Sequence, residues 1–229
     1  MFARPLPKVS DEEPSEARQV LQCLSRAEAL RDSVTNDHEE LVGIIASVLC
    51  EALHFETRHC EIVGRAAQLH DIGKFALPSD MLHKPGRLLP EEWALVKRHT
   101  EIGHGILRIE ESPFLSLAAT LALCHHEHFD GSGYPRGLAG DAIPFEARIV
   151  AVADTYEALR ANRAYKQGVG HDAAIATILE GDDRSRPTQF DPQVLLALER
   201  SAVLVAEHYD AGQAAIAEGR RLSQASRDD

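Results

Sequence analysis

The chain has 229 residues, 44% of them hydrophobic, and a formal net charge of −12. This acidic balance excludes general binding to nucleic acid or to an anionic membrane, because no broad basic surface is available to neutralise phosphates. The length suits one substantial domain, and no sustained run of alternating β-branched residues predicts strands, so the composition favours an all-α protein.

The N-terminal residues and the cysteines indicate a cytoplasmic protein. The opening MFARPLPKVSDEEP lacks the apolar core of a signal peptide, and the apolar stretches near 41–50 and 114–124 are too short to span a bilayer. The four cysteines, at 23, 50, 60 and 124, show no CxxC spacing and lie mostly in apolar helical contexts. We therefore expect a soluble protein with reduced, buried cysteines and with frayed ends over roughly 1–13 and 217–229.

Apolar spacing and capping residues predict helices along almost the whole chain. The expected helices cover 15–33, 36–55, 57–70, 90–99, 101–110, 113–126, 144–161, 171–181 and 192–219, with a loop and a short turn over 79–88. The second helix is expected to start near Asn36, and Thr57 is expected to cap the third. The helix that opens at Pro90 is expected to carry Trp93 and Val96 towards the core.

The stretch 125–135, HHEHFDGSGYP, joins imidazoles at a helix end to a glycine-rich turn. The apolar run before it, FLSLAATLALC, would bury its own end and carry His125 and His126 into the protein. Both rings can then reach a shared cluster, and buried imidazoles need partners. The glycines supply the backbone freedom of a tight loop, and Tyr134 gives that loop an aromatic, hydrogen-bonding tip.

The candidate metal ligands are imidazoles and carboxylates from five separate segments, each at a helix end or on an apolar helix. They are His38, His70, Asp71, His99, His125, His126 and Asp154. This set is too large for one tetrahedral zinc ion, and its mixed nitrogen and oxygen donors suit two octahedral ions such as iron or manganese. The charge of two divalent ions would exceed that of the two aspartates, so the site would attract a phosphate and suits phosphoester hydrolysis.

A structural role is the alternative for each histidine taken singly, because the chain has 12 of them and most of the others are explained as surface, capping or core residues. For one isolated histidine we set the odds at roughly four to one against metal binding. The adjacent pairs His70-Asp71 and His125-His126 change this balance. Two inward-facing polar pairs are costly to bury without a metal or a dense hydrogen-bond network.

Six ordered motifs resemble the HD-GYP domain, a branch of the HD metal-dependent phosphohydrolases. They are HDIGK at 70–74, KPGRL at 84–88, HTEIG at 99–103, HHEHFDGSGYP at 125–135, IPFEARIVAVAD at 143–154 and RAYK at 163–166. This set, with its full GYP loop, is far more specific than an HD pair alone. The resemblance divides the chain into an N-terminal tail and helix at 1–34, the phosphohydrolase domain at 35–185, and a C-terminal helix and polar tail at 186–229 packed on that domain.

The resemblance implies a helical bundle around a buried dinuclear or trinuclear metal centre. Its members hydrolyse cyclic di-GMP, a bacterial second messenger, to linear pGpG and in many cases to GMP, with a metal-bound hydroxide as the nucleophile. One ion would be held by His38, His70, Asp71 and Asp154. The other would be held by Asp71, His99, His125 and His126, so that Asp71 bridges the two.

The resemblance also assigns residues to the substrate. Lys74 would bind the phosphate under attack, and Tyr134 would contact the ligand from the glycine loop. Arg163 and Lys166 would meet its phosphates and guanine. These two residues are one helical turn apart and can point the same way, although an isolated pair with this spacing is usually a solvated helix end.

Two alternatives stand beside an active cyclic di-GMP phosphodiesterase. The first is an HD phosphohydrolase that acts on another nucleotide or cyclic dinucleotide. The second is a catalytically weak domain that binds the messenger or docks a diguanylate cyclase through the GYP loop. All the family's metal-ligand types except one are present, which favours catalysis.

The exception lies at position 34. Family members with three metals have a glutamate four residues before the first histidine ligand, and this chain has Val34 there. Valine has no donor atom, and Asp37 and Glu39 lie about 100° to either side of His38 around a helix. We therefore expect a dinuclear centre. Members with two metals carry the reaction past the linear intermediate less well, so we also expect pGpG as a major product.

Overall fold

The computed structural model describes residues 33–225 except 85, 110, 163–166 and 184. These residues form helices and contain no strand, which confirms the all-α prediction for the part of the chain described. The α-helices are α2 (Ser33–Ala52), α3 (Thr57–Ala67), α4 (Ser79–Leu82), α5 (Pro90–Lys97), α6 (His99–Leu107), α7 (Pro113–Cys124), α8 (Phe145–Arg160), α9 (His171–Glu180), α10 (Pro192–Arg200) and α11 (Ala202–Ala225). Short 3₁₀ turns are η1 (Ile72–Ala76), η2 (Gly140–Ala142) and η3 (Pro187–Gln189).

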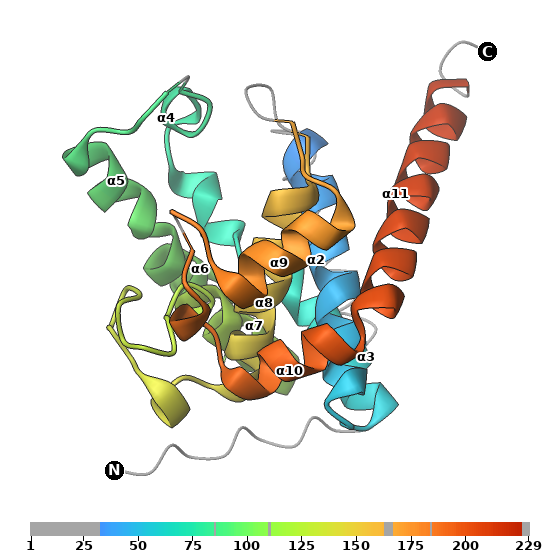
Figure 1. The fold of residues 1–229 in the computed structure, drawn as a ribbon. Coiled ribbons are helices and arrows are strands. Elements are labelled where there is room, and N and C mark those ends of the chain that lie inside the picture. The colour runs from blue at the N-terminus through green and yellow to red at the C-terminus, as the bar shows by residue number, and fades with distance from the viewer. Residues whose placement is uncertain (1–32, 85, 110, 163–166, 184, 226–229) are drawn as a thin grey trace.

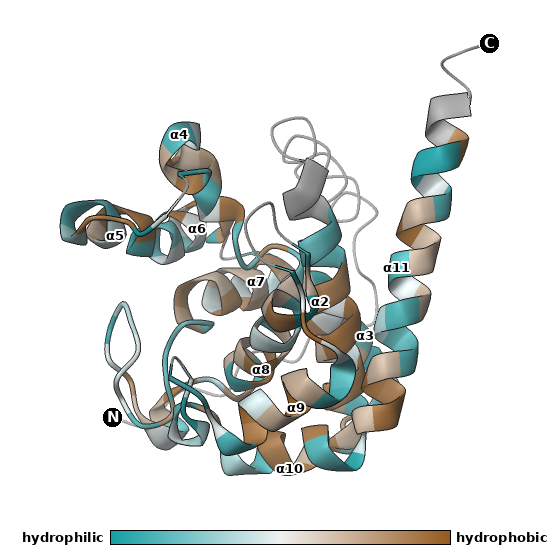
Figure 2. Ribbon diagram, turned by 45° about the horizontal axis from the view of Figure 1, so that its top comes forward, coloured by the Kyte–Doolittle hydropathy of each residue, from teal (hydrophilic) through white to brown (hydrophobic). Residues whose placement is uncertain are grey.

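One hydrophobic core joins the central helices of the bundle. α2 packs against α3, α8 and α11, and α7 packs against α3, α6 and α8 (Figure 1). The largest fully buried side chains include Ile45 and Leu49 of α2, Leu121 of α7 and Tyr156 of α8. In Figure 2 the ribbon of α7 and much of α2 is apolar, and hydrophilic residues are frequent on the peripheral α4 and α11. The core therefore lies where the helices bearing the predicted metal ligands meet.

Local sequence explains where several helices begin. α7 and α10 each open with a proline after a capping side chain: the hydroxyl of Ser112 accepts from Leu115 N at 3.2 Å, and the carboxylate of Asp191 accepts from Gln193 N at 2.7 Å. Two other predicted starts are wrong. α2 begins at Ser33 rather than near position 36, and Thr57 is the first residue of α3 rather than its cap.

The C-terminal part differs from the single helix predicted over 192–219. It is divided at Ser201, whose buried hydroxyl donates to the carbonyl oxygen of Ala197 at 2.7 Å and competes with helix continuation. α11 then turns to pack along α2 and continues to Ala225, so the fraying expected over 217–229 is wrong for residues 217–225, and 226–229 lie outside the described residues. Figure 1 shows its far end projecting beyond the bundle. The helix predicted over 15–33 lies outside the described residues except for its last position.

Burial follows the predictions for the cysteines but not for α5. Cys50, Cys60 and Cys124 are buried and form no disulfide, whereas Cys23 lies outside the described range. Val96 is buried, but Trp93 is 46% exposed, because α5 packs on the bundle mainly through its contact with α6. No helix of the described ranges is both long enough and apolar enough to cross a membrane.

Candidate metal centre

Four of the predicted ligands form a first donor group, made of Asp71, His99, His125 and His126, with one donor atom of each within 4.8 Å of the others. Asp71 precedes η1, His99 opens α6, and His125 and His126 directly follow α7. The Nε2 atoms of His99 and His125 lie 3.2 and 3.7 Å from Asp71 Oδ1. All four side chains except that of His126, which is partly buried, are buried.

A second donor group consists of His38 on α2, His70 after α3 and Asp154 on α8. Asp154 Oδ1 lies 3.4 Å from His38 Nε2 and 4.0 Å from His70 Nε2. The Oδ2 atom of Asp71 lies 3.4 Å from His70 Nε2 and 3.9 Å from His38 Nε2. Each oxygen of the Asp71 carboxylate therefore faces a different donor group.

Backbone carbonyls set the orientation of three of these imidazoles. The Nδ1 atom of His70 donates to Ala67 O at 2.7 Å, and that of His99 donates to Val96 O at 2.7 Å. His125 Nδ1 donates to the carbonyl oxygen of Leu121 at 3.0 Å. A carbonyl can only accept, so Nδ1 carries a proton in each ring and Nε2 is the nitrogen that points into the cluster.

Two buried atoms show that this donor set fits a metal. His70 Nε2 and Asp71 Oδ1 are buried and form no hydrogen bond with any described residue. Buried polar atoms without compensation are costly, and a divalent cation would satisfy both of them. Imidazole nitrogens and carboxylate oxygens in this number suit iron or manganese better than they suit a single tetrahedral zinc ion.

The protonation states also suit a metal centre. Burial and the neighbouring imidazoles hold the pKa of His125 and of His126 well below the ordinary histidine value, so both rings are neutral. Burial would raise the pKa of Asp71, but Lys74 and His70 outweigh it and hold that pKa well below its usual range. Neutral imidazoles and ionised carboxylates are the forms that bind metals.

The carboxylates of the cluster favour the protonated form of His70. Burial would lower the pKa of this imidazole, but Asp71 and Asp154 raise it to about 9. A cation bound at Nε2 would compete with the proton, so metal binding here would release one.

Two predicted substrate contacts border the donor groups. The ammonium of Lys74, in the middle of η1, forms a short ion pair with Asp71 Oδ2. The ring of Tyr134 packs over that of His126, with 4.8 Å between centroids and 33° between planes, and lies 6.5 Å from the ring of His99. Both side chains therefore lie directly beside predicted metal ligands.

The glycine loop that carries Tyr134 is held by the residues next to the histidines. The amide of Tyr134 donates to His126 O at 3.0 Å, and the buried carboxylate of Glu127 accepts from Arg136 N at 2.7 Å. A Cβ atom at Gly133 would lie 2.2 Å from the amide nitrogen of His128, so only glycine allows this approach. The loop's position is therefore coupled to that of the ligands.

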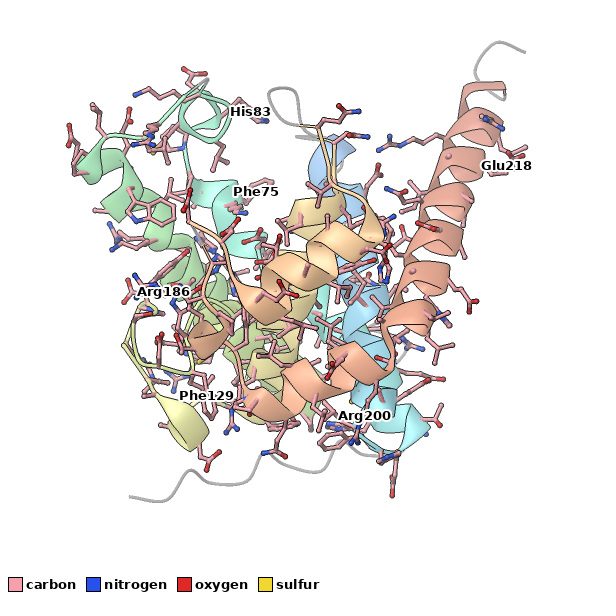
Figure 3. The ribbon with its side chains drawn as sticks, viewed as in Figure 1. Phe75, His83, Phe129, Arg186, Arg200 and Glu218 are labelled. Atoms are coloured by element: carbon pink, nitrogen blue, oxygen red, sulfur yellow. The ribbon has the colours of Figure 1, made fainter. Side chains whose placement is uncertain are left out.

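The segment just before α10 also holds the glycine loop in place. The amide of Phe129 donates to Gln189 O at 2.8 Å, and the hydroxyl of Thr188 donates to Asp130 Oδ2 at 2.9 Å. Figure 3 shows Phe129 and Arg186 on the same side of the molecule, where the loop approaches the segment before α10. Residues far apart in the chain thus fix the loop.

A family model described as HD domain matches residues 22–194, which is more than half of the chain. The chain belongs to the HD domain family. Its six motifs, from HDIGK to RAYK, place it in the HD-GYP branch of that family. The observed helical bundle, with histidines and aspartates gathered at its centre, confirms the predicted HD-domain fold.

Two curated relatives of this HD domain are named as phosphodiesterases. The cyclic di-GMP phosphodiesterase response regulator RpfG of Xanthomonas campestris pv. campestris is 43% identical over 183 residues, which is 80% of this chain and 47% of that protein. A cyclic di-GMP phosphodiesterase of Thermotoga maritima is 45% identical over 148 residues, which is 65% of this chain and 40% of that protein. The chain thus spans less than half the length of these two relatives.

A solved structure shares the fold. Bd1817, described as a HDG"Y"P protein from Bdellovibrio bacteriovorus, aligns with a TM-score of 0.57 and 20% sequence identity. The alignment covers 73% of this chain and 51% of that one. At this level of identity the likeness concerns the fold alone.

Glu157 is a residue of this HD domain that the sequence patterns did not single out. Its buried carboxylate accepts a short hydrogen bond from Nδ1 of His38, whereas His70, His99 and His125 use backbone carbonyls. It lies one helical turn after Asp154 on α8, so a second carboxylate on the same apolar face was the available signal. Glu157 orients the His38 ring so that Nε2 faces Asp154.

We expect Glu157→Ala to weaken metal binding at the second donor group by about 10- to 100-fold, the usual effect of removing a group that orients a metal ligand. Competition with a chelator followed by metal analysis measures this affinity. Glu146→Ala is the matched control, because Glu146 lies on the same helix, 3.2 Å from a ring nitrogen of His59, which is in neither donor group. Equal metal affinities for the two variants would contradict the role of Glu157.

The sequence singled out three further positions, two as substrate contacts and one as the missing metal ligand. Arg163 and Lys166 lie outside the described residues. Position 34 lies within α2, one turn before His38, so its backbone is helical there. The helix therefore extends to the position at which a third-metal ligand would be needed.

Proposed function

We propose that this HD domain is a metal-dependent phosphodiesterase that hydrolyses cyclic di-GMP to pGpG. The observation that carries the proposal is the position of Asp71, whose two oxygens face two different groups of buried donors. A bridging carboxylate between two ions is the arrangement that metal-assisted phosphoester hydrolysis uses. The names of the two curated relatives support the choice of substrate.

The proposed roles of the residues follow from their positions. His38, His70, Asp71 and Asp154 would hold one ion, and Asp71, His99, His125 and His126 the other. Two bound divalent ions, for which we propose iron or manganese, would supply Lewis acidity and a water of lowered pKa. Lys74 lies beside Asp71 and would hold an oxygen of the scissile phosphate, and Tyr134 would limit the substrate's position above His126. Arg163 and Lys166 are proposed to contact phosphate and guanine.

The proposed phosphohydrolase domain comprises residues 35–185, preceded by a tail and helix at 1–34. Within the segment 186–229, α10 and α11 pack against α2, which supports treating it as part of the same folded unit. In the alternative function, this protein would bind cyclic di-GMP but hydrolyse it weakly. The loop around Tyr134 would then be its contact surface for a diguanylate cyclase.

Anaerobic purification, metal analysis and chromatography of the products test the function. The metal-loaded protein should convert cyclic di-GMP to pGpG, and the same assay with 3′3′-cGAMP tests a different cyclic dinucleotide. Binding of cyclic di-GMP without turnover would favour the docking role. Turnover of 3′3′-cGAMP alone would replace the proposed substrate.

We expect two metal ions per chain rather than three, because Val34 offers no donor atom one helical turn before His38. With two ions, pGpG should accumulate as a major product. Anomalous scattering from metal-replete crystals counts the ions, and timed product analysis follows pGpG. A well-occupied third ion near His38 would contradict the first expectation, and rapid conversion of pGpG to GMP the second.

A further inference from the structure

Trp93 is unusually placed for the only tryptophan of the chain. It belongs to α5, a helix that lies at the outside of the bundle in Figure 1, and Trp93 is 46% exposed to solvent. Its buried part meets Tyr134, edge to face, with 6.0 Å between ring centroids and 79° between planes. An apolar ring of this size is left partly in water directly beside the loop that covers the first donor group.

Lys97 reaches the same tyrosine from the same helix. It follows Trp93 by four residues, so both side chains project from one face of α5, while Val96 is the buried member of that turn. The ammonium of Lys97 lies 5.7 Å from the centroid of the Tyr134 ring. Trp93 and Lys97 therefore both lie against the ring of Tyr134, and that ring packs on His126.

This arrangement has the features of a nucleotide subsite. Nucleobases stack on aromatic side chains whatever their sequence identity, because every base has a π face. A cation beside the aromatic ring suits the phosphate of the stacked nucleotide. A tryptophan kept only for packing would have its ring turned towards the core, as the apolar pattern of α5 predicts.

We propose that Trp93 and Lys97 form a subsite for one nucleotide of cyclic di-GMP, next to the first donor group, which contains His99 and His126. One guanine stacks on the exposed ring of Trp93, and the ammonium of Lys97 contacts the phosphate of that nucleotide. The subsite rests on the proposed function for the identity of its ligand. Because stacking accepts any base, it contributes affinity rather than selection of guanine.

The single tryptophan makes the test specific. Protein loaded with Mn²⁺ is titrated with a non-hydrolysable phosphorothioate analogue of cyclic di-GMP, and tryptophan fluorescence is compared with the heat of binding. We expect saturable quenching with the same midpoint as the calorimetric curve. Calorimetric binding that leaves the fluorescence unchanged would overturn the subsite.

Substitutions separate the subsite from general damage. Trp93→Ala should weaken binding and raise KM by about 5- to 100-fold, with kcat changed less than about threefold, and Trp93→Phe should restore most of the loss. Lys97→Ala should weaken binding and reduce its salt dependence. Metal content and the thermal transition should match the wild type. Phe55→Ala is the control, because Phe55 is also an exposed aromatic residue and lies beyond the opposite end of α2 from His38.

The outcomes distinguish the two proposals. Release of pGpG by the wild type together with an unchanged KM for Trp93→Ala would overturn the subsite and leave the proposed function standing. Absence of both binding and hydrolysis of cyclic di-GMP in the metal-loaded wild type would overturn both.

Discussion

Asp71→Ala should abolish hydrolysis of cyclic di-GMP and remove most of the bound metal. One carboxylate oxygen lies 3.2 Å from the nearest nitrogen of the first donor group and the other lies 3.4 Å from the nearest nitrogen of the second, whereas a methyl group serves neither. The loss of metal affinity should exceed the roughly 10- to 100-fold that follows removal of a residue that only orients a ligand. Metal analysis beside single-turnover product analysis measures both effects.

The metal-free fold should survive this substitution. His70 and His99 are held by backbone carbonyls independently of Asp71, so the helix ends that carry them keep their local hydrogen bonds. Asp172→Ala, at an exposed aspartate in the first turn of α9, is the control and should keep full metal content. An Asp71→Ala variant that retained its metals and its turnover would refute the bridging role.

Gly73→Ala should disrupt the metal centre indirectly, by displacing η1 from α6. A Cβ atom at Gly73 would lie 1.9 Å from the carbonyl oxygen of His99 and 2.6 Å from the amide nitrogen of Gly103. Both contacts are with backbone, which cannot rotate away as a side chain can. We expect the free energy of unfolding to fall by about 3 kcal/mol, the upper end of the usual cost of overpacking. The shift of His99 relative to Asp71 should also lower metal content.

Gly105→Ala is the matched control for that experiment. Gly105 lies in the interior of α6, and a Cβ atom there would meet nothing within 4 Å. Replacing an exposed helical glycine with alanine should raise the free energy of unfolding by about 0.5–1 kcal/mol. Chemical denaturation and metal analysis of the two variants measure the comparison. Equal stability of Gly73→Ala and the wild type would contradict the close packing of η1 on α6.

Much of the fold was predictable because its determinants are local. Apolar residues recur with helical spacing, and Pro113 and Pro192 mark helix starts after capping side chains, so the number and rough extent of most helices follow from neighbouring residues. Predictions failed where distant contacts decide. The direction of α11 after the break at Ser201 depends on its packing along α2, which no local pattern contains.

The candidate site shows the same division between local and distant causes. The types of donor, and the burial of the HD and HH pairs, follow from the sequence, because apolar helices carry these pairs inward. Helix packing places each oxygen of Asp71 towards a different donor group and brings Glu157 to His38 across 119 residues of chain. It also turned Trp93 to the surface beside Tyr134. Such pairings depend on how whole helices pack, because the side chains involved are brought together only when the core forms.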